Sequence, residues 1–156
     1  MSNEKKTCRE VMVDVFDFPH VPYWFTLRQV AGILKKSLGG DKCLSPASVL
    51  VFDEKYNLVG HLDIAEILKR LQPLFTLAET GETPAELKAL SEIPASDMMI
   101  PSRTFADPDD SILTAAALMT GNNLSMLPVL EQRKKLIGIV RTVEIFKELT
   151  MAFFNS

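Results

Sequence analysis

Residues 136–149, LIGIVRTVEIFKEL, decide the fold, because residues 58–71 carry the same pattern as LVGHLDIAEILKRL. Each stretch begins with apolar residues, reaches a glycine, and then takes the spacing of an amphipathic helix that ends on a leucine. Gly60 and Gly138 lie 78 positions apart, and the final leucines keep the same offset. This constant offset indicates an internal duplication. Two copies indicate a pair of units and not a solenoid, which needs three or more.

The composition is typical of a water-soluble globular protein. The 156 residues are 47% hydrophobic and 24% charged, with a net charge of −3. No apolar run approaches the roughly 20 residues that a transmembrane helix needs, and no signal-peptide pattern follows the opening MSNEKK. We therefore expect a cytoplasmic protein with no membrane partner, and the acidic balance disfavours nucleic acid as a partner. Cys8 and Cys43 lack metal-site spacing and are expected to be free thiols.

Each copy is predicted to run strand, helix, strand, strand, helix, which makes the fold class α/β. The first copy covers residues 8–72 and the second covers residues 95–150, with a linker at 73–94 that contains a short helix from Pro84. Thr104 and Phe105 are expected to form the short first strand of the second copy. The acidic residues before Ile112 are interpreted as helix caps in preference to a cation site. Arg133, in the predicted hairpin turn, is expected to be solvated.

The duplicated pattern resembles the CBS domain, a family named for cystathionine β-synthase. The residues that carry the resemblance are ASDMMIP at 95–101, SMLPVLEQRKKLIGIVRTVEIFKEL at 125–149 and VLVFDEKYNLVGHLDIAEILKRL at 49–71. A tandem CBS pair implies two β-α-β-β-α repeats packed about a pseudo-two-fold axis. It also implies a regulatory module that binds AMP, ADP, ATP or S-adenosylmethionine in clefts between the repeats.

The family's usual ligand motif is a glycine, two apolar residues, a threonine or serine, two spacers and an aspartate. This chain departs from that motif in both copies, because Arg141 and Glu144 replace the hydroxyl and the aspartate in the second, and Asp63 and Glu66 replace them in the first. Arg141 can bind a phosphate by charge-assisted hydrogen bonds, whereas Asp63 repels one. The cleft of the second copy is therefore preferred, and we assign to it Ile100, Pro101, Leu127, Pro128, Arg141 and Glu144. The weaker cleft, that of the first copy, is assigned Val13, Leu50, Asp63 and Glu66.

Less specific interpretations of the same residues stay open. Arg141 and Glu144 are spaced i, i+3 and can form a simple surface ion pair, as can Glu66 with Lys69 or Arg70. His61 replaces an apolar strand residue and is expected to be structural and not a ligand. The degenerate clefts can also be filled by side chains such as Trp24, which would leave a ligand-free interaction scaffold.

The resulting prediction is a regulatory, stand-alone CBS pair that senses an adenosine ligand and acts through a protein partner. The alternative is a ligand-free dimerisation scaffold. The sequence shows no nucleophile, metal-ligand or phosphate-loop motif, so we expect no catalytic residues, no metal and no cofactor. CBS pairs commonly dimerise through their helices. The apolar residues that continue to the end of the chain favour a homodimer, and we call them the C-terminal stripe: Phe146, Leu149, Phe153 and Phe154.

Overall fold

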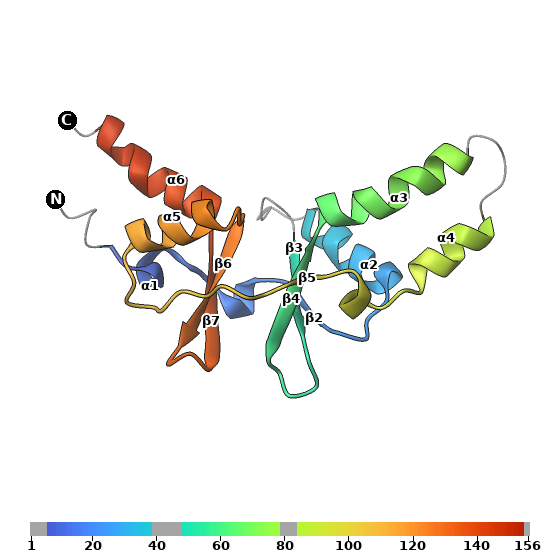
Figure 1. Cartoon of the computed structure of the whole chain (residues 1–156), viewed down its shortest axis with the longest axis horizontal. Helices are drawn as coiled ribbons and strands as arrows, with labels where there is room; N and C mark the ends of the chain where they lie inside the picture. Colours follow the sequence, from blue (N-terminus) through green and yellow to red (C-terminus); the bar gives the residue numbers. More distant parts are fainter. Residues whose placement is uncertain (1–5, 39–47, 79–83, 155–156) are drawn as a thin grey trace. The chain divides into compact units, whose positions relative to one another are not determined.

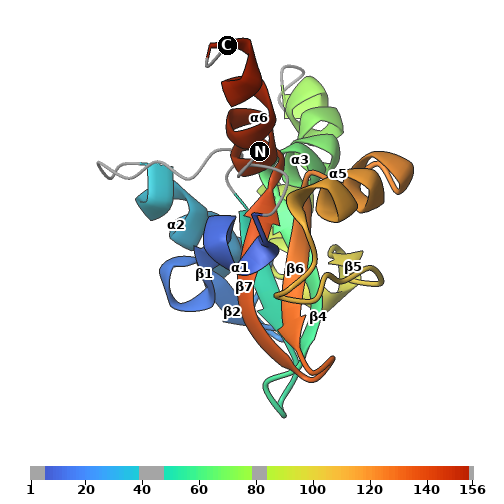
Figure 2. The same ribbon diagram turned by 90° about the vertical axis from the view of Figure 1, so that its left-hand side faces the viewer.

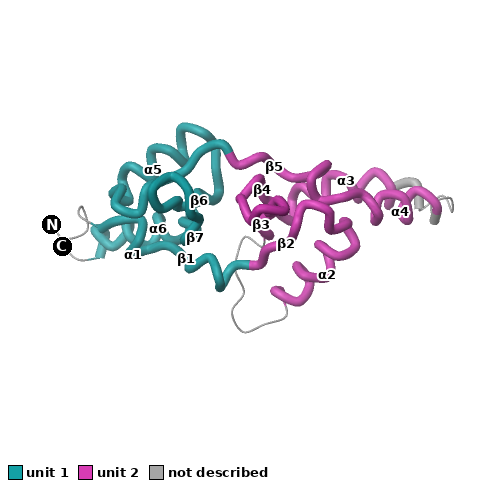
Figure 3. The backbone as a smooth tube through the Cα atoms, turned by 90° about the horizontal axis from the view of Figure 1, so that it is seen from below, with its two compact units in different colours: residues 1–18, 103–156 teal, residues 19–102 magenta. Residues whose placement is uncertain are grey.

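The computed structural model describes residues 6–38, 48–78 and 84–154, so Cys43 lies outside the described residues. The chain divides into two compact units (Figure 3). Unit 1 contains residues 1–18 and 103–156, and unit 2 contains residues 19–102. These units differ from the predicted repeats, because the amino-terminal segment packs with the second repeat. The word repeat therefore refers to similarity within the sequence, and the word unit refers to the residues that pack together in the structure.

Unit 2 is a four-stranded sheet with helices, in the order β2-β3-β4-β5. Strand β2 pairs parallel with β3, while β3 with β4 and β4 with β5 pair antiparallel. Helix α4 packs against both α2 and α3 (Figure 1). The elements are β2 (His20–Pro22), α2 (Leu27–Leu38), β3 (Ser48–Phe52), β4 (Leu58–Asp63), α3 (Ile64–Ala78), α4 (Pro84–Ser91), η3 (Ala95–Asp97) and β5 (Ile100–Pro101).

Unit 1 repeats this plan around a three-stranded antiparallel sheet in the order β1-β7-β6. Both α1 and β1 lie beside β7, and α5 packs against α6 (Figure 2). The elements are α1 (Cys8–Val11), β1 (Val13–Asp14), η2 (Val15–Asp17), α5 (Ile112–Gly121), β6 (Met126–Glu131), β7 (Lys135–Arg141), α6 (Thr142–Thr150) and η4 (Met151–Phe153).

The predicted strand at Thr104 and Phe105 is wrong. Only Ala106 bridges to the sheet: its amide donates to Pro128 O, and its carbonyl accepts from the amide of Leu130. The chain does not continue the ladder, because the next four residues turn into the start of α5. Their hydrogen bonds lie within that turn or join the amino-terminal segment, where the Arg9 and Cys8 amides donate to the carbonyls of Pro108 and Asp110. After β5, the second repeat therefore joins its own sheet first by a single bridge and not by a strand.

Side-chain caps define the start of two helices. Thr26 and Gln29 form a reciprocal cap before α2: the Thr26 amide donates to Gln29 Oε1 at 2.9 Å, and the Gln29 amide donates to Thr26 Oγ1 at 3.4 Å. Ser111 caps α5 by accepting from the Thr114 amide at 3.1 Å. Inside α2, Leu27, Val30 and Leu34 share the buried face at helical spacing.

Each unit has its own hydrophobic core, made where the helices cover the sheet. In unit 2 the fully buried side chains come from β2, β3, β4, α2 and η3. In unit 1 they come from β6, β7, α5 and the amino-terminal segment, where Cys8 is free and completely buried. The most deeply buried members of the two core clusters are Val21, Val30, Val49, Val51, Leu62 and Ala95 in unit 2, and Cys8, Ala115, Leu127, Val129 and Val140 in unit 1.

Gly60 in β4 and Gly138 in β7 lie where a short strand from the other repeat pairs closely with the glycine's own strand. A Cβ on Gly60 would lie 2.7 Å from the carbonyl oxygen of Ile100, and a Cβ on Gly138 would lie 2.8 Å from that of Val13. Val13 therefore joins the sheet of the second repeat, and Ile100 joins the sheet of the first. Each repeat lends its leading strand to the other repeat's sheet, and only glycine leaves room for it.

Candidate functional site

The preferred site residues Arg141 and Glu144 meet at the junction between β7 and α6. The guanidinium of Arg141 donates through Nε to Glu144 Oε1 at 2.8 Å and through Nη2 to Oε2 at 2.6 Å. Glu144 Oε1 also accepts from the Arg141 backbone amide at 3.0 Å, which caps the first turn of α6. The side chains are only 11% and 14% exposed, so this is a largely buried bidentate pair and not a surface one.

The equivalent junction in the first repeat is built differently. Asp63 Oδ1 accepts from the Glu66 backbone amide at 2.9 Å, so Asp63 itself caps α3. Glu66 pairs with Lys69 at 3.2 Å, and the lysine side chain is 73% exposed. The predicted surface ion pair is therefore present here, where it involves Lys69, while Arg70 donates instead to the carbonyl of Asp97. This junction offers an anionic group where the second repeat offers a cation.

Strand register places the remaining residues of the second junction. Met126 lies opposite Arg141, and Pro128 lies opposite Ile139, which is paired on its other side with Val13. Leu127 is completely buried in the core of unit 1, and Pro128 is buried beside it. Unit 1 thus brings together four residues of the preferred set, Leu127, Pro128, Arg141 and Glu144, with Val13 of the weaker set.

Ile100 and Pro101 of the preferred set lie in unit 2. They form β5, where Ile100 lies opposite His61 and Pro101 lies opposite Gly60. His61 is paired on its other side with Leu50, so the unit also contains Leu50, Asp63 and Glu66 of the weaker set. The sequence shows that residues 95–101 mirror the amino-terminal segment, but it carries no signal for which sheet each segment joins.

Burial also fixes the charge state of His61. Its side chain is buried in the middle of the four-stranded sheet, and this burial lowers the pKa of the imidazole below its ordinary value. The nearby carboxylates of Asp63 and Glu66 oppose the shift but do not reverse it. The neutral ring is therefore favoured, which agrees with the structural role predicted from the sequence.

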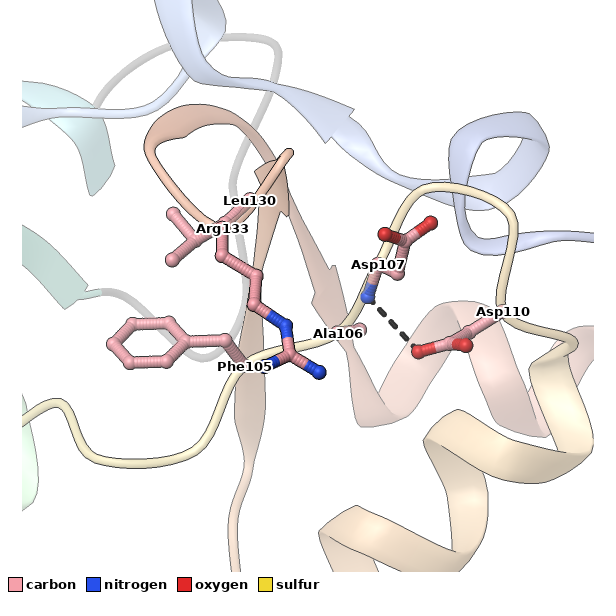
Figure 4. Close-up of a pocket in the computed structure, with 6 residues that line it drawn as sticks. All are labelled: Phe105, Ala106, Asp107, Asp110, Leu130 and Arg133. Carbon is pink, nitrogen blue, oxygen red and sulfur yellow. Dashed lines mark hydrogen bonds between the residues drawn. The ribbon is translucent and has the colours of Figure 1, made fainter.

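A cavity of about 440 Å³ lies elsewhere in unit 1, beside the β6–β7 turn (Figure 4). Its lining comes from two segments that are distant in the sequence: Phe105, Ala106, Asp107, Asp110, Leu130 and Arg133. The Asp107 amide donates to Asp110 Oδ2 at 2.9 Å, and Asp107 Oδ1 accepts from the Asp109 amide at 3.0 Å. Both carboxylates therefore hold the turn before α5, as the capping prediction required. Sequence reasoning missed the cavity, because it placed Arg133 in solvent alone.

The described residues contain no group of three His, Cys, Asp or Glu side chains that could hold a metal ion. Within the same part of the chain, none of the helices has the length and apolar character to cross a membrane. Burial raises the pKa of the Cys8 thiol to about 11, with help from the negative charges of Asp110 and Asp107. Cys8 is therefore protonated and unreactive at neutral pH.

Comparison with known proteins agrees with this geometry. Residues 95–150 match the family model of the CBS domain. The crystal structure of CBSX2 in complex with AMP covers 94% of this chain and 98% of its own, with a TM-score of 0.69 at 18% sequence identity. The structure of a CBS domain-containing protein from Bacillus anthracis covers 96% of both chains, with a TM-score of 0.72 at 19% identity.

This chain carries a CBS domain and has the fold of a tandem CBS pair. A relative by sequence is the uncharacterized protein MJ1426 of Methanocaldococcus jannaschii, which is 32% identical over 104 residues. That match spans 65% of this chain and 59% of the relative's own length. The predicted α/β class and the CBS resemblance are therefore confirmed. The glycine of the duplicated pattern is Gly60 in the first repeat and Gly138 in the second.

Proposed function

We propose that this CBS pair is a cytosolic regulatory module, not an enzyme, and that it binds an adenosine ligand with Arg141 and Glu144. The candidates are AMP, ADP, ATP and S-adenosylmethionine. The observation that carries the proposal is the largely buried guanidinium and carboxylate at the start of α6. Support also comes from the AMP complex of CBSX2, which shares the fold.

The chemistry of this junction suits a nucleotide. The amino-terminal end of α6 favours an anion, because the positive end of the helix dipole lies there. Arg141 would add two donors in a planar fork that matches a phosphate. Once released from Arg141, the Glu144 carboxylate can accept hydrogen bonds from ribose hydroxyls. Leu127 and Pro128 of the same unit are proposed to supply the apolar part of the site.

In the weaker cleft we propose that Val13, Leu50, Asp63 and Glu66 do not hold a phosphate. Asp63 presents a negative charge at the start of α3, where its Oδ1 accepts from the Glu66 amide. Adding a phosphate would place two anions together, which is unfavourable. One adenosine ligand for each chain is the expected stoichiometry.

The test is thermal unfolding of the purified protein with each of the four ligands. A ligand at about 100 times its dissociation constant stabilises the folded state by about 2.7 kcal/mol, which raises Tm by roughly 5–11 °C for a protein of this size. Arg141→Ala should abolish the shift. Arg9→Ala is the matched control, because Arg9 also pairs with a glutamate, Glu131, but on an exposed surface.

The absence of any shift at millimolar concentrations of all four ligands would contradict the proposal. A Tm shift that survives Arg141→Ala but disappears in a variant of the first junction, such as Asp63→Ala, would assign the binding site to the start of α3. Isothermal calorimetry on the same variants gives the stoichiometry directly.

The second candidate function is a ligand-free interaction scaffold. One observation favours it: Arg141 and Glu144 already satisfy each other through two hydrogen bonds, so a ligand must displace a formed pair. Trp24, in contrast, is 55% exposed and in edge contact with Tyr23, so its own surface is available to a partner. Restoring the usual family motif with Arg141→Thr and Glu144→Asp separates the candidates. If the protein is a scaffold with an intact cleft, the wild type shows no Tm shift with adenosine ligands and this variant gains one. If the protein is a sensor, the wild type already shows the shift.

We further propose that the protein is a homodimer that contacts itself through the C-terminal stripe. Phe146, Phe153 and Phe154 are 67%, 75% and 82% exposed, and Leu149 is 40% exposed. Phe146, Leu149 and Phe153 follow helical spacing and share one side of the final helix. A contiguous apolar surface of this kind on a small protein marks an interaction site.

A further inference from the structure

A groove of about 490 Å³ lies on unit 2 where three helices meet, and no residue of the proposed ligand site lines it. Its floor is apolar and its rim is basic. The floor is made by Leu27, Ala31, Gly32, Ile67, Leu71 and Leu87. The rim carries Arg28 and Lys35 from α2 and Lys88 from α4, and no acidic residue is among the described residues that line the groove.

The rim cations are not neutralised within the described part of the chain. None of the ion pairs found there involves Arg28, Lys35 or Lys88. Arg28 makes a long contact, 3.5 Å from Nη2 to Ser91 Oγ, and this neutral partner leaves its charge uncompensated. All three side chains are exposed, so the groove presents an apolar strip bordered by positive charge.

The shape of the groove suits a helix. Arg28 and Lys35 are seven residues apart, which places them on one side of α2 with about 10 Å between them along the axis. Ala31 and Gly32 lie between them, and a Cβ added to Gly32 would meet no atom within 4 Å. Small residues at this position allow the backbone of a second helix to approach closely.

We propose that this groove docks an acidic amphipathic helix of a partner protein. The apolar face of that helix covers the floor, with large side chains spaced i, i+3 or i+4 and i+7. Carboxylates two turns apart on its flank lie against Arg28 and Lys35, and another lies against Lys88. The inference does not rest on nucleotide binding, because it uses only side chains of α2, α3 and α4.

Charge argues against two other occupants. Self-association through this groove would bring three cations of one copy against three of the other, which is unfavourable. The last helix of a second copy does not supply free acids either, since Glu144 pairs with Arg141 and Glu148 pairs with Lys6. A fatty acid has one carboxylate at one end, whereas these cations are spread over two helices and two turns of α2. A partner with several carboxylates fits the spread.

The test selects helical peptides from a randomised phage-displayed library on the full-length protein. Binding of synthetic versions of the selected peptides is then measured by fluorescence anisotropy at low and high salt. We expect peptides with leucine or aromatic residues at helical spacing and flanking glutamates or aspartates. Charge reversal in Arg28→Glu with Lys35→Glu should weaken binding at least about tenfold, and salt should weaken wild-type binding.

Gly32→Leu fills the floor without straining the fold, because the added side chain meets open space and leucine is a better helix former than glycine. It should also weaken binding at least about tenfold. Lys147→Glu, on the exposed side of α6, is the matched charge control and should leave binding unchanged. Circular dichroism of each variant verifies that the fold is retained.

Four outcomes would overturn the proposal. The library yields no peptide whose binding responds to Gly32→Leu, or the selected peptides lack acidic residues. A fluorescent fatty acid binds the wild type and is lost in Gly32→Leu, which would assign the groove to a lipid. Gly32→Leu or the charge reversal changes the mass of the protein in sedimentation, which would assign the groove to a second copy.

Discussion

At the scale of single residues, Gly60 and Gly138 leave room for the leading strand of the other repeat to pair with the strand that contains the glycine. In Gly138→Ala the new methyl group would collide with the Met12 side chain and the carbonyl oxygen of Val13. Since a backbone atom cannot move aside as a flexible side chain can, we expect a loss of about 1–3 kcal/mol in the free energy of unfolding. Gly60→Ala should cost a similar amount. Urea denaturation measures both.

Gly32→Ala is the matched control for these two substitutions. Gly32 lies within α2, and nothing stands within 4 Å of the position where its Cβ would be. Alanine there should raise the free energy of unfolding by roughly 0.5–1 kcal/mol, because it is the better helix former. If all three alanine variants had the same stability, close approach would not explain the repeat glycines.

His61 makes stability depend on pH. Its pKa is lowered in the folded protein from the ordinary value of 6.5, so the unfolded chain takes up a proton before the folded one does. The stability that neutral His61 contributes is complete above this ordinary value and is lost as the pH falls below it. His61→Ile, which copies the equivalent Ile139 of the second repeat, should flatten the dependence between roughly pH 5 and 6.5.

Urea midpoints of the wild type and His61→Ile across this range test the prediction through their slopes and not through absolute stability. Parallel pH profiles for the wild type and His61→Ile would show that burial of this ring does not produce the dependence.

At the scale of elements, the cap of α5 shows how a local signal sets a helix boundary. Ser111 Oγ accepts from the Thr114 amide, and the next residue receives a bond from the amino-terminal segment, since the Ile112 amide donates to Lys6 O. Ser111→Ala removes the side-chain acceptor and should lower the free energy of unfolding by about 1 kcal/mol. Ser111→Thr keeps the acceptor and should stay close to wild type in the same urea experiment. Equal losses in both would assign the effect to packing.

The sequence predicts most elements because each has a local cause. The caps at Thr26 and Ser111, the helical spacing after Asp63 and the paired apolar runs of the hairpins all act within a few residues. It does not predict which sheet receives Val13 or Ile100, because a strand of two residues has no periodicity of its own. Similarity between repeats shows which segments fold alike, and only packing shows which segments pair.

The candidate site divides in the same way. The spacing of Arg141 and Glu144 is enough to predict that they pair, because residues at i and i+3 are neighbours on a helix. Their burial is not predictable from spacing, since it depends on what packs over the end of β7. The basic groove on unit 2 is even harder to predict from the sequence. Leu27, Ile67 and Leu87 come from three helices, and each alone looks like an ordinary core or half-buried position.

At the scale of the whole molecule, the surfaces described here have different charges and therefore suit different contacts. The groove on unit 2 has three cations on its rim that form no ion pair within residues 6–38, 48–78 and 84–154, and their charge disfavours docking of the same groove of a second copy. The C-terminal stripe on unit 1 is aromatic and can be self-complementary, as a two-fold interface requires. A protein with both surfaces can dimerise through one and still leave the other open to a partner.

The stripe leads to a prediction about mass in solution. We expect sedimentation velocity to give twice the chain mass of 17.4 kDa for the wild type. Phe146→Asp with Phe153→Asp should return the mass to that of a single chain, because buried carboxylates at the centre of a two-fold interface would be unpaired and would repel each other across the axis. Phe16→Asp, at an aromatic side chain that is 88% exposed but lies outside the stripe, should remain dimeric. A monomeric wild type, or a double variant that stays dimeric, would remove the stripe as the interface. A monomeric wild type would also mean that the adenosine response has to be explained within one chain, because it could not act through contact between two copies.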